Sequence, residues 1–443
     1  MPSQSSTSSA KRVPSARTIS KAIDALVALD ERRLSKRQRY SIESNDANAE
    51  DLDSASPVVD RFIAAKGVDV VHTLTNFSAS ELNTLWTNIK PYISRNWNVG
   101  SGRKCPVTGK DMLFMTLVTL KHAGTWDIVA ASFEESTATF SSRVTQFIRV
   151  LHPHLVRKYI EEQGVKWTMH QLAVAGLQFE THKSALYAVD VTFQQTTTPA
   201  ASFGEKKVFF SKKHGLYGLK VEVSVAPNGL AIHVSECAVG STSDFEIFKT
   251  NLPFHTKQLE KQPCDSNVSD TEALKDKYPA HWALLADKGY QGIQEYVRGF
   301  TPLKRPPHGQ LTLEQDRANA KLSSDRVIVE NSFGRLKTLW GLVSDKFTWK
   351  KDEYNMYFQT CVALTNVHIR FNPLRNVDGE GYNQYKNRLL SIGSKIKTRN
   401  SSSKAKYREN RKARVHAVLG RANSGYTSED YDIGYDEGDD IFD

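Results

Sequence analysis

The sequence predicts an α/β domain, with a mixed sheet flanked by helices, that follows a separate helical segment. From residue 186 onward the apolar residues alternate with polar ones or form short runs, as they do in strands. Residues 113–151 and 326–343 instead repeat apolar residues every three or four positions, as amphipathic helices do. With 443 residues, 39% of them hydrophobic, the chain is long enough to bury a substantial core.

The charge balance favours a polyanionic partner. The chain has 59 Lys and Arg residues against 49 Asp and Glu residues, which gives a formal net charge of +10. Its four cysteines show no paired spacing, so the sequence indicates neither a zinc site nor a disulfide framework. No apolar run reaches the roughly 18 residues that a membrane span needs. We therefore expect a soluble, intracellular protein with no membrane partner.

Both ends of the chain are predicted to be disordered tails that carry basic and acidic blocks. Residues 1–60 are rich in Ser, Ala, Lys and Arg, with a short helical pattern around residues 19–34 and an acidic stretch after it, and little there could bury a core. Residues 375–443 hold a basic block followed by an acidic one. The basic cluster at residues 31–40 indicates either a nuclear-localisation or nucleic-acid patch or a solvated helix face. From the long tails we expect a eukaryotic source and a location in the nucleus.

Residues 61–165 are predicted to form a helix-turn-helix-like DNA-binding region. Three short helices are expected here, the second with Thr125 as its N-cap. The third repeats apolar residues at i, i+4, i+7 and i+11, which are Phe140, Val144, Phe147 and Leu151. Its outward face carries Arg143 and Gln146, which we expect to contact DNA. The alternative is an ordinary helical bundle that packs on the next domain.

Residues 166–374 are predicted to form the sheet domain. The run LYAVDVTF, residues 186–193, indicates a strand that only Asp190 interrupts. Residues 219–225 alternate as a second strand, and the turn PNG joins it to a third strand as a hairpin. The run HWALLADKGYQG indicates another short buried strand that ends near Asp287. Helices follow it, which makes a mixed α/β sheet domain.

Two aspartates share one context in these strands. Asp190 and Asp287 each follow several apolar residues. A charge inside a buried strand is costly unless it is paired or bound to a metal, so we expect each acid at a strand end near solvent. For either residue alone, capping a turn is the simpler interpretation. Their shared context favours a common site.

A third acid lies on the helix that follows. One apolar stripe of this helix is expected to pack on the sheet, and it consists of Val329, Phe333, Leu336 and Trp340. Glu330 lies about a quarter turn from the centre of the stripe, which places its carboxylate where the helix meets the sheet. The alternative is a surface ion pair between Glu330 and Arg326, which stands four residues earlier.

The three carboxylates, without clustered His or Cys, are the hard oxygen ligands that Mg²⁺ and Mn²⁺ prefer. In a basic protein the expected substrate is a phosphodiester. One of two metal ions would activate the attacking water, and the other would stabilise the leaving oxygen. The basic residues near these acids are candidates to hold DNA phosphates. They are Lys288, Lys304, Arg305, Arg326, Arg335 and Lys337.

Five stretches resemble the motifs of the DDE superfamily of transposases, specifically the endonuclease branch of PIF/Harbinger-like elements and their bacterial insertion-sequence relatives. YAVDVTF is similar to the strand with the first aspartate, GSTSDFEIF to a glycine–serine motif with an acid, and LLADKGYQG to the turn with the second aspartate. RVIVENSFGRLK resembles the glutamate helix, and ALTNVHIRFNP resembles the closing helix. The resemblance covers about residues 187–372.

The resemblance implies an RNase H-like fold in which Asp190, Asp287 and Glu330 bind the catalytic metals. It places Asp244 near the site, although this residue suits a helix N-cap equally well. The sequence departs from the family pattern at two places. The first strand reads DVTFQQ rather than Asp-Gly-Thr, and GSTSD has no His before its Asp.

The function implied by the resemblance is a transposase, or a transposase-derived endonuclease, that cuts DNA at element ends and transfers the 3′-hydroxyl to target DNA. The resemblance also implies a homo-oligomer assembled on DNA and a separate Myb-like DNA-binding partner. Two alternatives stay open: a domesticated protein that binds DNA without cutting it, and an RNase H-like nuclease without strand transfer.

Overall fold

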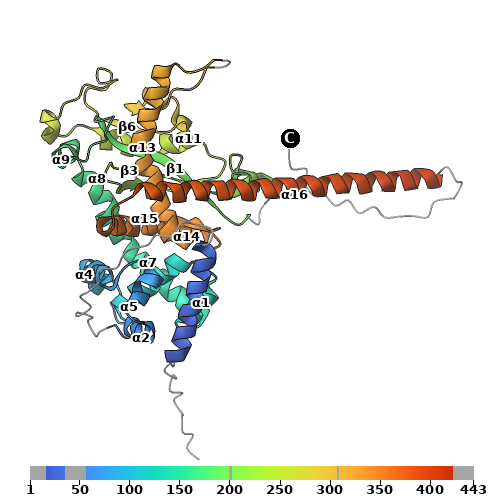
Figure 1. Ribbon diagram of the computed structural model, residues 1–443. Coiled ribbons are helices and arrows are strands. Elements are labelled where there is room, and N and C mark those ends of the chain that lie inside the picture. Colours follow the sequence, from blue (N-terminus) through green and yellow to red (C-terminus); the bar gives the residue numbers. More distant parts are fainter. Residues whose placement is uncertain (1–15, 35–55, 199–201, 307–308, 423–443) are drawn as a thin grey trace, which may run out of the picture. The chain divides into compact units, whose positions relative to one another are not determined.

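The computed structural model describes residues 16–34, 56–198, 202–306 and 309–422 (Figure 1). Parts of both predicted tails, including residues 35–40 of the basic cluster, lie outside these ranges. The chain divides into two compact units, residues 1–389 and residues 390–443. Within the described ranges, no helix is both long and apolar enough to cross a membrane.

A bundle of helices forms the first part of the larger unit. Its helices are α1 (Ala16–Leu34), α2 (Pro57–Lys66), α3 (Asp69–Thr75), α4 (Ala79–Asn96), α5 (Gly109–His122), α6 (Trp126–Ser132), α7 (Thr137–Val156), the π-helical turn Arg157–Glu161, α8 (Glu162–Lys166) and α9 (Met169–Val174). Residues 110–122 of α5 are all buried, so α5 is the centre of the bundle. The prediction of a disordered tail at residues 1–60 is wrong for α1. Ile19, Ile23 and Leu26 repeat at i, i+4 and i+7 and are buried against neighbouring helices.

Helices α6 and α7 stand where the second and third helices of a helix-turn-helix are predicted. The apolar stripe of α7 is buried as expected. The outward side of α7 packs in part against α15, where the hydroxyls of Thr145 and Tyr357 lie 3.2 Å apart. Arg143 forms an ion pair with Glu135, whereas Gln146 is exposed. The bundle thus packs on the sheet domain, and the DNA-reading role of α7 stays a prediction.

The described part of the chain forms one sheet of seven strands. They are β1 (Ala185–Gln195), β2 (Phe210–Ser211), β3 (Leu216–Val225), β4 (Ala231–Val234), β5 (Ala238–Val239), β6 (Ala283–Leu285) and β7 (Gly299–Phe300). The accompanying helices are α10 (Phe203–Val208), α11 (Asp244–Thr250), α12 (Leu252–Leu259), α13 (Leu313–Leu339), α14 (Gly341–Ser344) and α15 (Tyr354–Phe371). β1 pairs antiparallel with β3, which forms the predicted hairpin with β4, and β6 and β7 continue the sheet in parallel. The predicted mixed α/β sheet is therefore confirmed.

Helices cover both faces of the sheet. Tyr187 and Val189 of β1 point into a buried core that includes residues of α9, α11 and α12. Gln194 points to the opposite face, where its Nε2 atom donates to the carbonyl of Leu342 at 2.7 Å. Helix α13 crosses this second face beside β1 (Figure 1). The alternation of β1 therefore turns the side chain of Asp190 toward α13.

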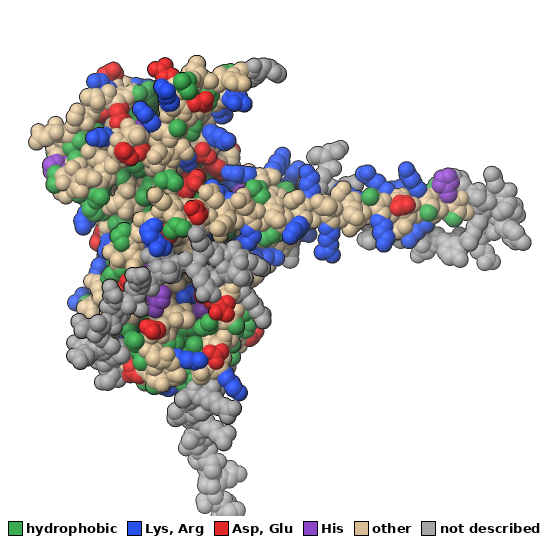
Figure 2. Space-filling model, in the orientation of Figure 1, with side chains coloured by type: hydrophobic (Ala, Val, Ile, Leu, Met, Phe, Trp, Pro, Cys, Tyr) green, Lys and Arg blue, Asp and Glu red, His purple; other side chains and the backbone are tan. Residues whose placement is uncertain are grey.

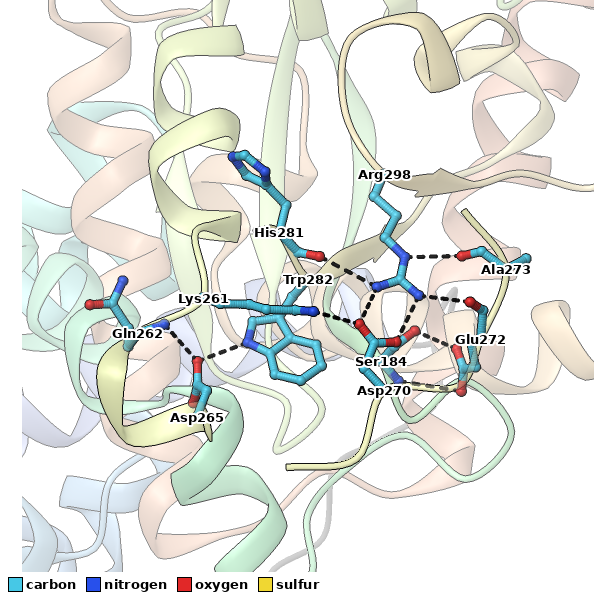
Figure 3. A network of polar contacts seen from close by, with 10 residues as sticks. All are labelled: Ser184, Lys261, Gln262, Asp265, Asp270, Glu272, Ala273, His281, Trp282 and Arg298. Atoms are coloured by element: carbon cyan, nitrogen blue, oxygen red, sulfur yellow. Dashed lines mark hydrogen bonds and ion pairs between the residues drawn. The ribbon is translucent and has the colours of Figure 1, made fainter. Parts of the chain in front are cut away.

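A polar network fixes the edge of the sheet where β6 and β7 begin (Figure 3). The fully buried guanidinium of Arg298 donates to Asp270 at 2.6 and 2.8 Å. Lys261 Nζ donates to the same carboxylate at 2.7 Å and lies over the ring of Trp282. Burial raises the pKa of Asp270, but the hydrogen bonds from Arg298 and Lys261 outweigh burial and lower this pKa to about 2. The network ties the long segment between β5 and β6 to the start of β6.

The first turns of α16 (Asn376–Ala422) belong to the larger unit, so the prediction of a disordered tail from residue 375 is wrong for this helix. Tyr382 and Tyr385 are buried, and the hydroxyl of Tyr385 donates to the carbonyl of Phe193 on β1 at 2.7 Å. The composition of this stretch is polar and charged, which predicts disorder, but a few aromatic side chains in it are buried and order the start of the helix. Residues 423–443 of the predicted tail lie outside the described ranges.

Gly334 lets the start of α16 pack directly on α13. A Cβ atom at this position would lie 1.7 Å from the carbonyl oxygen of Asp378. That oxygen belongs to the backbone, so no flexible side chain can relieve the overlap. The same close packing brings the neighbouring Arg335 within 2.8 Å of the Asp378 carboxylate.

We expect Gly334→Ala to lower the free energy of unfolding by at least about 2 kcal/mol, because the added methyl group forces α16 away from α13. Urea unfolding followed by circular dichroism measures this change. Gly204→Ala is the matched control, since no atom lies within 4 Å of an added Cβ there and alanine favours its helix. Equal stability of the two variants would contradict the close contact between α13 and α16.

Candidate active site

Asp190 and Asp287 lie at the same level of two neighbouring parallel strands. Ala188 of β1 pairs with Leu285 of β6, and each aspartate stands two residues beyond its member of this pair. Asp287 follows the end of its strand, as predicted. The prediction is wrong for Asp190, which is in the middle of β1 because β1 continues alongside β3 to Gln195. The short neighbour β6 leaves this part of β1 uncovered, and the Asp190 side chain is 16% exposed.

The guanidinium of Arg326 lies between the two aspartates. Its Nη2 atom is 3.7 Å from Asp190 Oδ2, and its Nη1 atom is 3.6 Å from Asp287 Oδ1. The Arg326 side chain is only 8% exposed. Arg326 therefore joins α13 to both strands. Because α13 turns it toward the sheet, the alternative of a surface ion pair with Glu330 does not hold, and the predicted DNA contact of Arg326 is wrong.

Glu330 lies one helical turn after Arg326, beside a residue of α16. Lys386 Nζ is 3.6 Å from Glu330 Oε1, and the Glu330 side chain is 27% exposed. Burial raises the pKa of the Tyr382 hydroxyl, and the charges of Asp190 and Glu330 raise it further. Glu330 and Arg326 lie one turn apart on α13, the helix that covers the face of the sheet to which Asp190 points.

The electrostatics of Asp190 show that several acids converge on it. Burial raises the pKa of Asp190 to about 6, although the positive charge of Arg326 acts against this increase. The carboxylates of Asp287 and Asp244 raise the pKa as well. Negative charges that repel one another in a largely buried site favour the binding of a cation there.

Asp244 occupies the first position of α11, and Ser243 is the N-cap. The prediction that Asp244 is itself the N-cap is therefore wrong. Asp244 Oδ1 lies 3.0 Å from Lys220 Nζ. A Cβ atom added to Gly289 would lie 3.3 Å from Asp244 Oδ2. Asp244 thus lies against the turn that carries Asp287.

The chemistry of these residues fits a hard divalent cation. Asp190 and Asp287 present carboxylate oxygens to one shared positive group, which is Arg326. In the described ranges, however, no group of three or more His, Cys, Asp and Glu side chains is close enough to hold a metal ion. Glu330 faces Lys386 instead of Arg326. The aspartate pair is therefore the part of the predicted triad that the structure brings together.

Three of the predicted phosphate-binding residues are at the surface. Lys288 stands directly after Asp287 and is exposed. Lys304 and Arg305 are exposed in the segment after β7. These three residues remain candidates to hold DNA phosphates near the aspartates.

The predictions for Arg335 and Lys337 are wrong, because both side chains are buried. Arg335 is 0% exposed and donates to the Asp378 carboxylate. Lys337 is 2% exposed, and its Nζ atom donates to the carbonyl of Val343 at 2.7 Å. Helical spacing placed both residues on the side of Glu330, but α15 and α16 cover this part of α13.

A buried network on the other face of the sheet holds the Asp287 turn, and sequence reasoning missed it. Glu222 of β3 is fully buried and accepts from the hydroxyl of Tyr290 at 3.2 Å and from Asn251 at 2.9 Å. His255 Nε2 lies 3.0 Å from the same carboxylate. The alternation along β3 suggests an outward polar face, yet this face is buried under α11 and α12. The glutamate within an apolar strand could have indicated this network, because a buried carboxylate needs hydrogen-bond partners.

Asp325 is a second acid that sequence reasoning missed. Its carboxylate accepts from the backbone amides of Glu180 and His182 at 3.2 and 2.9 Å. These hydrogen bonds fix the loop before β1 to α13. Asp325 therefore places the helix on the sheet one residue before Arg326.

Two comparisons with known proteins match the part of the chain that carries this site. Residues 189–366, which include Asp190, Asp287 and Glu330, match the model of a family described as DDE superfamily endonuclease. A probable transposase for insertion sequence element IS702 from Microchaete diplosiphon is 31% identical over 185 residues. That match covers 42% of this chain and 57% of the relative, so it spans little more than half of the relative's length. No solved structure matches the chain.

We expect Asp190→Asn to stabilise the protein more at pH 8 than at pH 4.5 when EDTA is present. The folded-state pKa of about 6 exceeds the unfolded value, so ionised Asp190 destabilises the fold as pH rises through this range. This pKa already includes the attraction to Arg326, so the cost approaches about 3 kcal/mol above pH 7. Urea unfolding at both pH values measures the difference. Asp276→Asn, at an exposed acid, is the control, and a stability difference that is independent of pH would contradict the raised pKa.

We expect Tyr290→Phe to loosen the turn that carries Asp287, because Glu222 loses a buried hydrogen bond while the ring stays in the core. Amide hydrogen exchange in residues 287–290 should accelerate, and stability should fall by about 1 to 3 kcal/mol. Tyr278→Phe is the control, since its hydroxyl bonds at the surface. Unchanged exchange in the turn would show that Glu222 does not hold it.

Proposed function

We propose that this chain, whose residues 189–366 match the model of a family described as DDE superfamily endonuclease, is a metal-dependent transposase or transposase-derived endonuclease. Its substrate would be the DNA phosphodiester at an element end, and the freed 3′-hydroxyl would then be joined to target DNA. The observation that carries the proposal is the pair Asp190 and Asp287, placed level on parallel strands around one positive group.

The carboxylates have a defined role in this chemistry. Asp190 and Asp287, together with Glu330, would hold Mg²⁺ or Mn²⁺, and two such ions would activate the attacking water and stabilise the leaving oxygen. Ionised Asp190 is the form that binds a cation, so its raised pKa predicts weaker metal binding below about pH 6. The exposed Lys288, Lys304 and Arg305 would position the phosphate backbone beside the acids.

Finer assignments are also proposals. The motifs named above favour the PIF/Harbinger-like branch, with a homo-oligomer on DNA, a Myb-like partner and a location in the nucleus. The net charge of +10 supports a DNA substrate. Gln146 on α7, and Arg143 if it leaves Glu135, would contact DNA next to the cleavage site.

A second candidate function is DNA binding without cleavage. It is favoured by the cations that already neutralise the acids, since Arg326 faces both aspartates and Lys386 faces Glu330. In such a domesticated protein the carboxylates would serve only the fold.

Nicking of supercoiled plasmid in Mg²⁺, Mn²⁺ or EDTA tests the proposal. We expect metal-dependent nicking that falls by about 100-fold or more in Asp190→Asn, Asp287→Asn and Glu330→Gln, because each removes a ligand charge. Asp276→Asn should cut as the wild type does, since this acid is exposed elsewhere on the surface.

The outcomes separate the candidates. Nicking that survives Asp190→Asn or Asp287→Asn would mean that the site is assigned wrongly. Tight DNA binding by the wild type without nicking would favour the non-cleaving protein. Nicking without joining of a labelled 3′-hydroxyl end to the plasmid would favour a nuclease that lacks strand transfer.

A further inference from the structure

The second part of α16 is a helix with an unusual concentration of positive charge. Residues 394–417 are all exposed. Lys and Arg side chains line it (Figure 2), and they are Lys395, Lys397, Arg399, Lys404, Lys406, Arg408, Arg411, Lys412 and Arg414. The acidic side chain in this segment is Glu409. No function described so far uses this helix.

Seven of the nine basic residues lie on two opposite sides of the helix, and Lys412 and Arg414 lie between these sides. Lys395, Arg399 and Lys406 are spaced i, i+4 and i+11, which places them on one side of a helix with 3.6 residues per turn. A second set, Lys397, Arg408 and Arg411, lies about half a turn away. The helix therefore has no apolar face that could pack against a protein core.

Positive charges on neighbouring turns of the helix also repel one another. Like charges stand four residues apart at Lys395 and Arg399 and at Arg408 and Lys412. Each such pair destabilises a helix by a few tenths of a kcal/mol, about 0.2 to 0.5. A polyanion that neutralises both sides would remove this repulsion and stabilise the helix.

We propose that residues 394–417 bind in the major groove of duplex DNA, with each side of the helix facing one phosphate backbone. The major groove is about 12 Å wide and accepts an α-helix, and a segment of this length spans about one turn of B-DNA. The major groove of duplex RNA is too narrow and deep for side chains to enter. The choice of DNA rests on the proposed function, but the contact itself requires no cleavage.

Salt-dependent binding of the full chain to a random-sequence DNA duplex in EDTA tests the proposal. Each lost phosphate contact should reduce the slope of log K against log salt by about 0.9. We expect a reduction of about 2 to 3 for Lys395→Gln/Arg399→Gln/Lys406→Gln and a similar one for Lys397→Gln/Arg408→Gln/Arg411→Gln. Helical circular dichroism of the wild type should increase when DNA is added.

The matched control is Lys183→Gln/Lys257→Gln/Lys275→Gln, which removes the same charge from exposed positions of the larger unit outside residues 61–165. Slopes that fall equally in all three variants, or in none, would overturn the proposal. A reduction for one side of the helix alone would overturn the groove placement, as would equal losses on duplex RNA. Because binding is measured without metal, a protein that fails to nick plasmid can still confirm the helix contact, and the converse also holds.

Discussion

The site depends on one interaction, the placement of the Arg326 guanidinium between Asp190 and Asp287. Two carboxylates at the same level of adjacent strands repel each other, and a planar cation with several donors can face both. The same helix contributes Asp325, which anchors the loop before β1, and Glu330 one turn further on. Asp325, Arg326 and Glu330 thus contribute to the site from one short stretch of α13. A movement of this helix would shift Arg326 and Glu330 together relative to the two aspartates.

Contacts on both faces of the sheet hold this arrangement in place. Arg326 fixes the aspartates from the side of α13, whereas Glu222 fixes the Asp287 turn from the opposite side through Tyr290. The network around Arg298 is a third anchor, at the end of β6 that is farther from Asp287. Because β6 has only three residues, its own hydrogen bonds are few, and these side chains supply the rigidity that the short strand lacks.

The sequence predicted those features that repeat or that break a pattern. The buried stripe of α13, the hairpin and the two aspartates in apolar runs were all visible as periodicity or its interruption. The errors concern residues whose environment comes from distant segments. Arg335 and Lys337 are buried because α15 and α16 pack over them. The periodicity of one helix does not show which distant segments pack against it. Glu222 was missed for the same reason, since an alternating strand looks the same whether its polar face meets water or a second layer of helices.

The packing of α16 on α13 has a consequence for evolution and for protein engineering. The stretch shared with the family ends at residue 366, but the Asp378 carboxylate that neutralises buried Arg335 lies beyond it. A fragment cut at the limit of similarity would keep a buried cation without its counter-ion, at a cost of several kcal/mol. It would also lose Lys386 and uncover Glu330. A fragment of this chain that keeps its charges paired is therefore longer than the stretch that matches the family model.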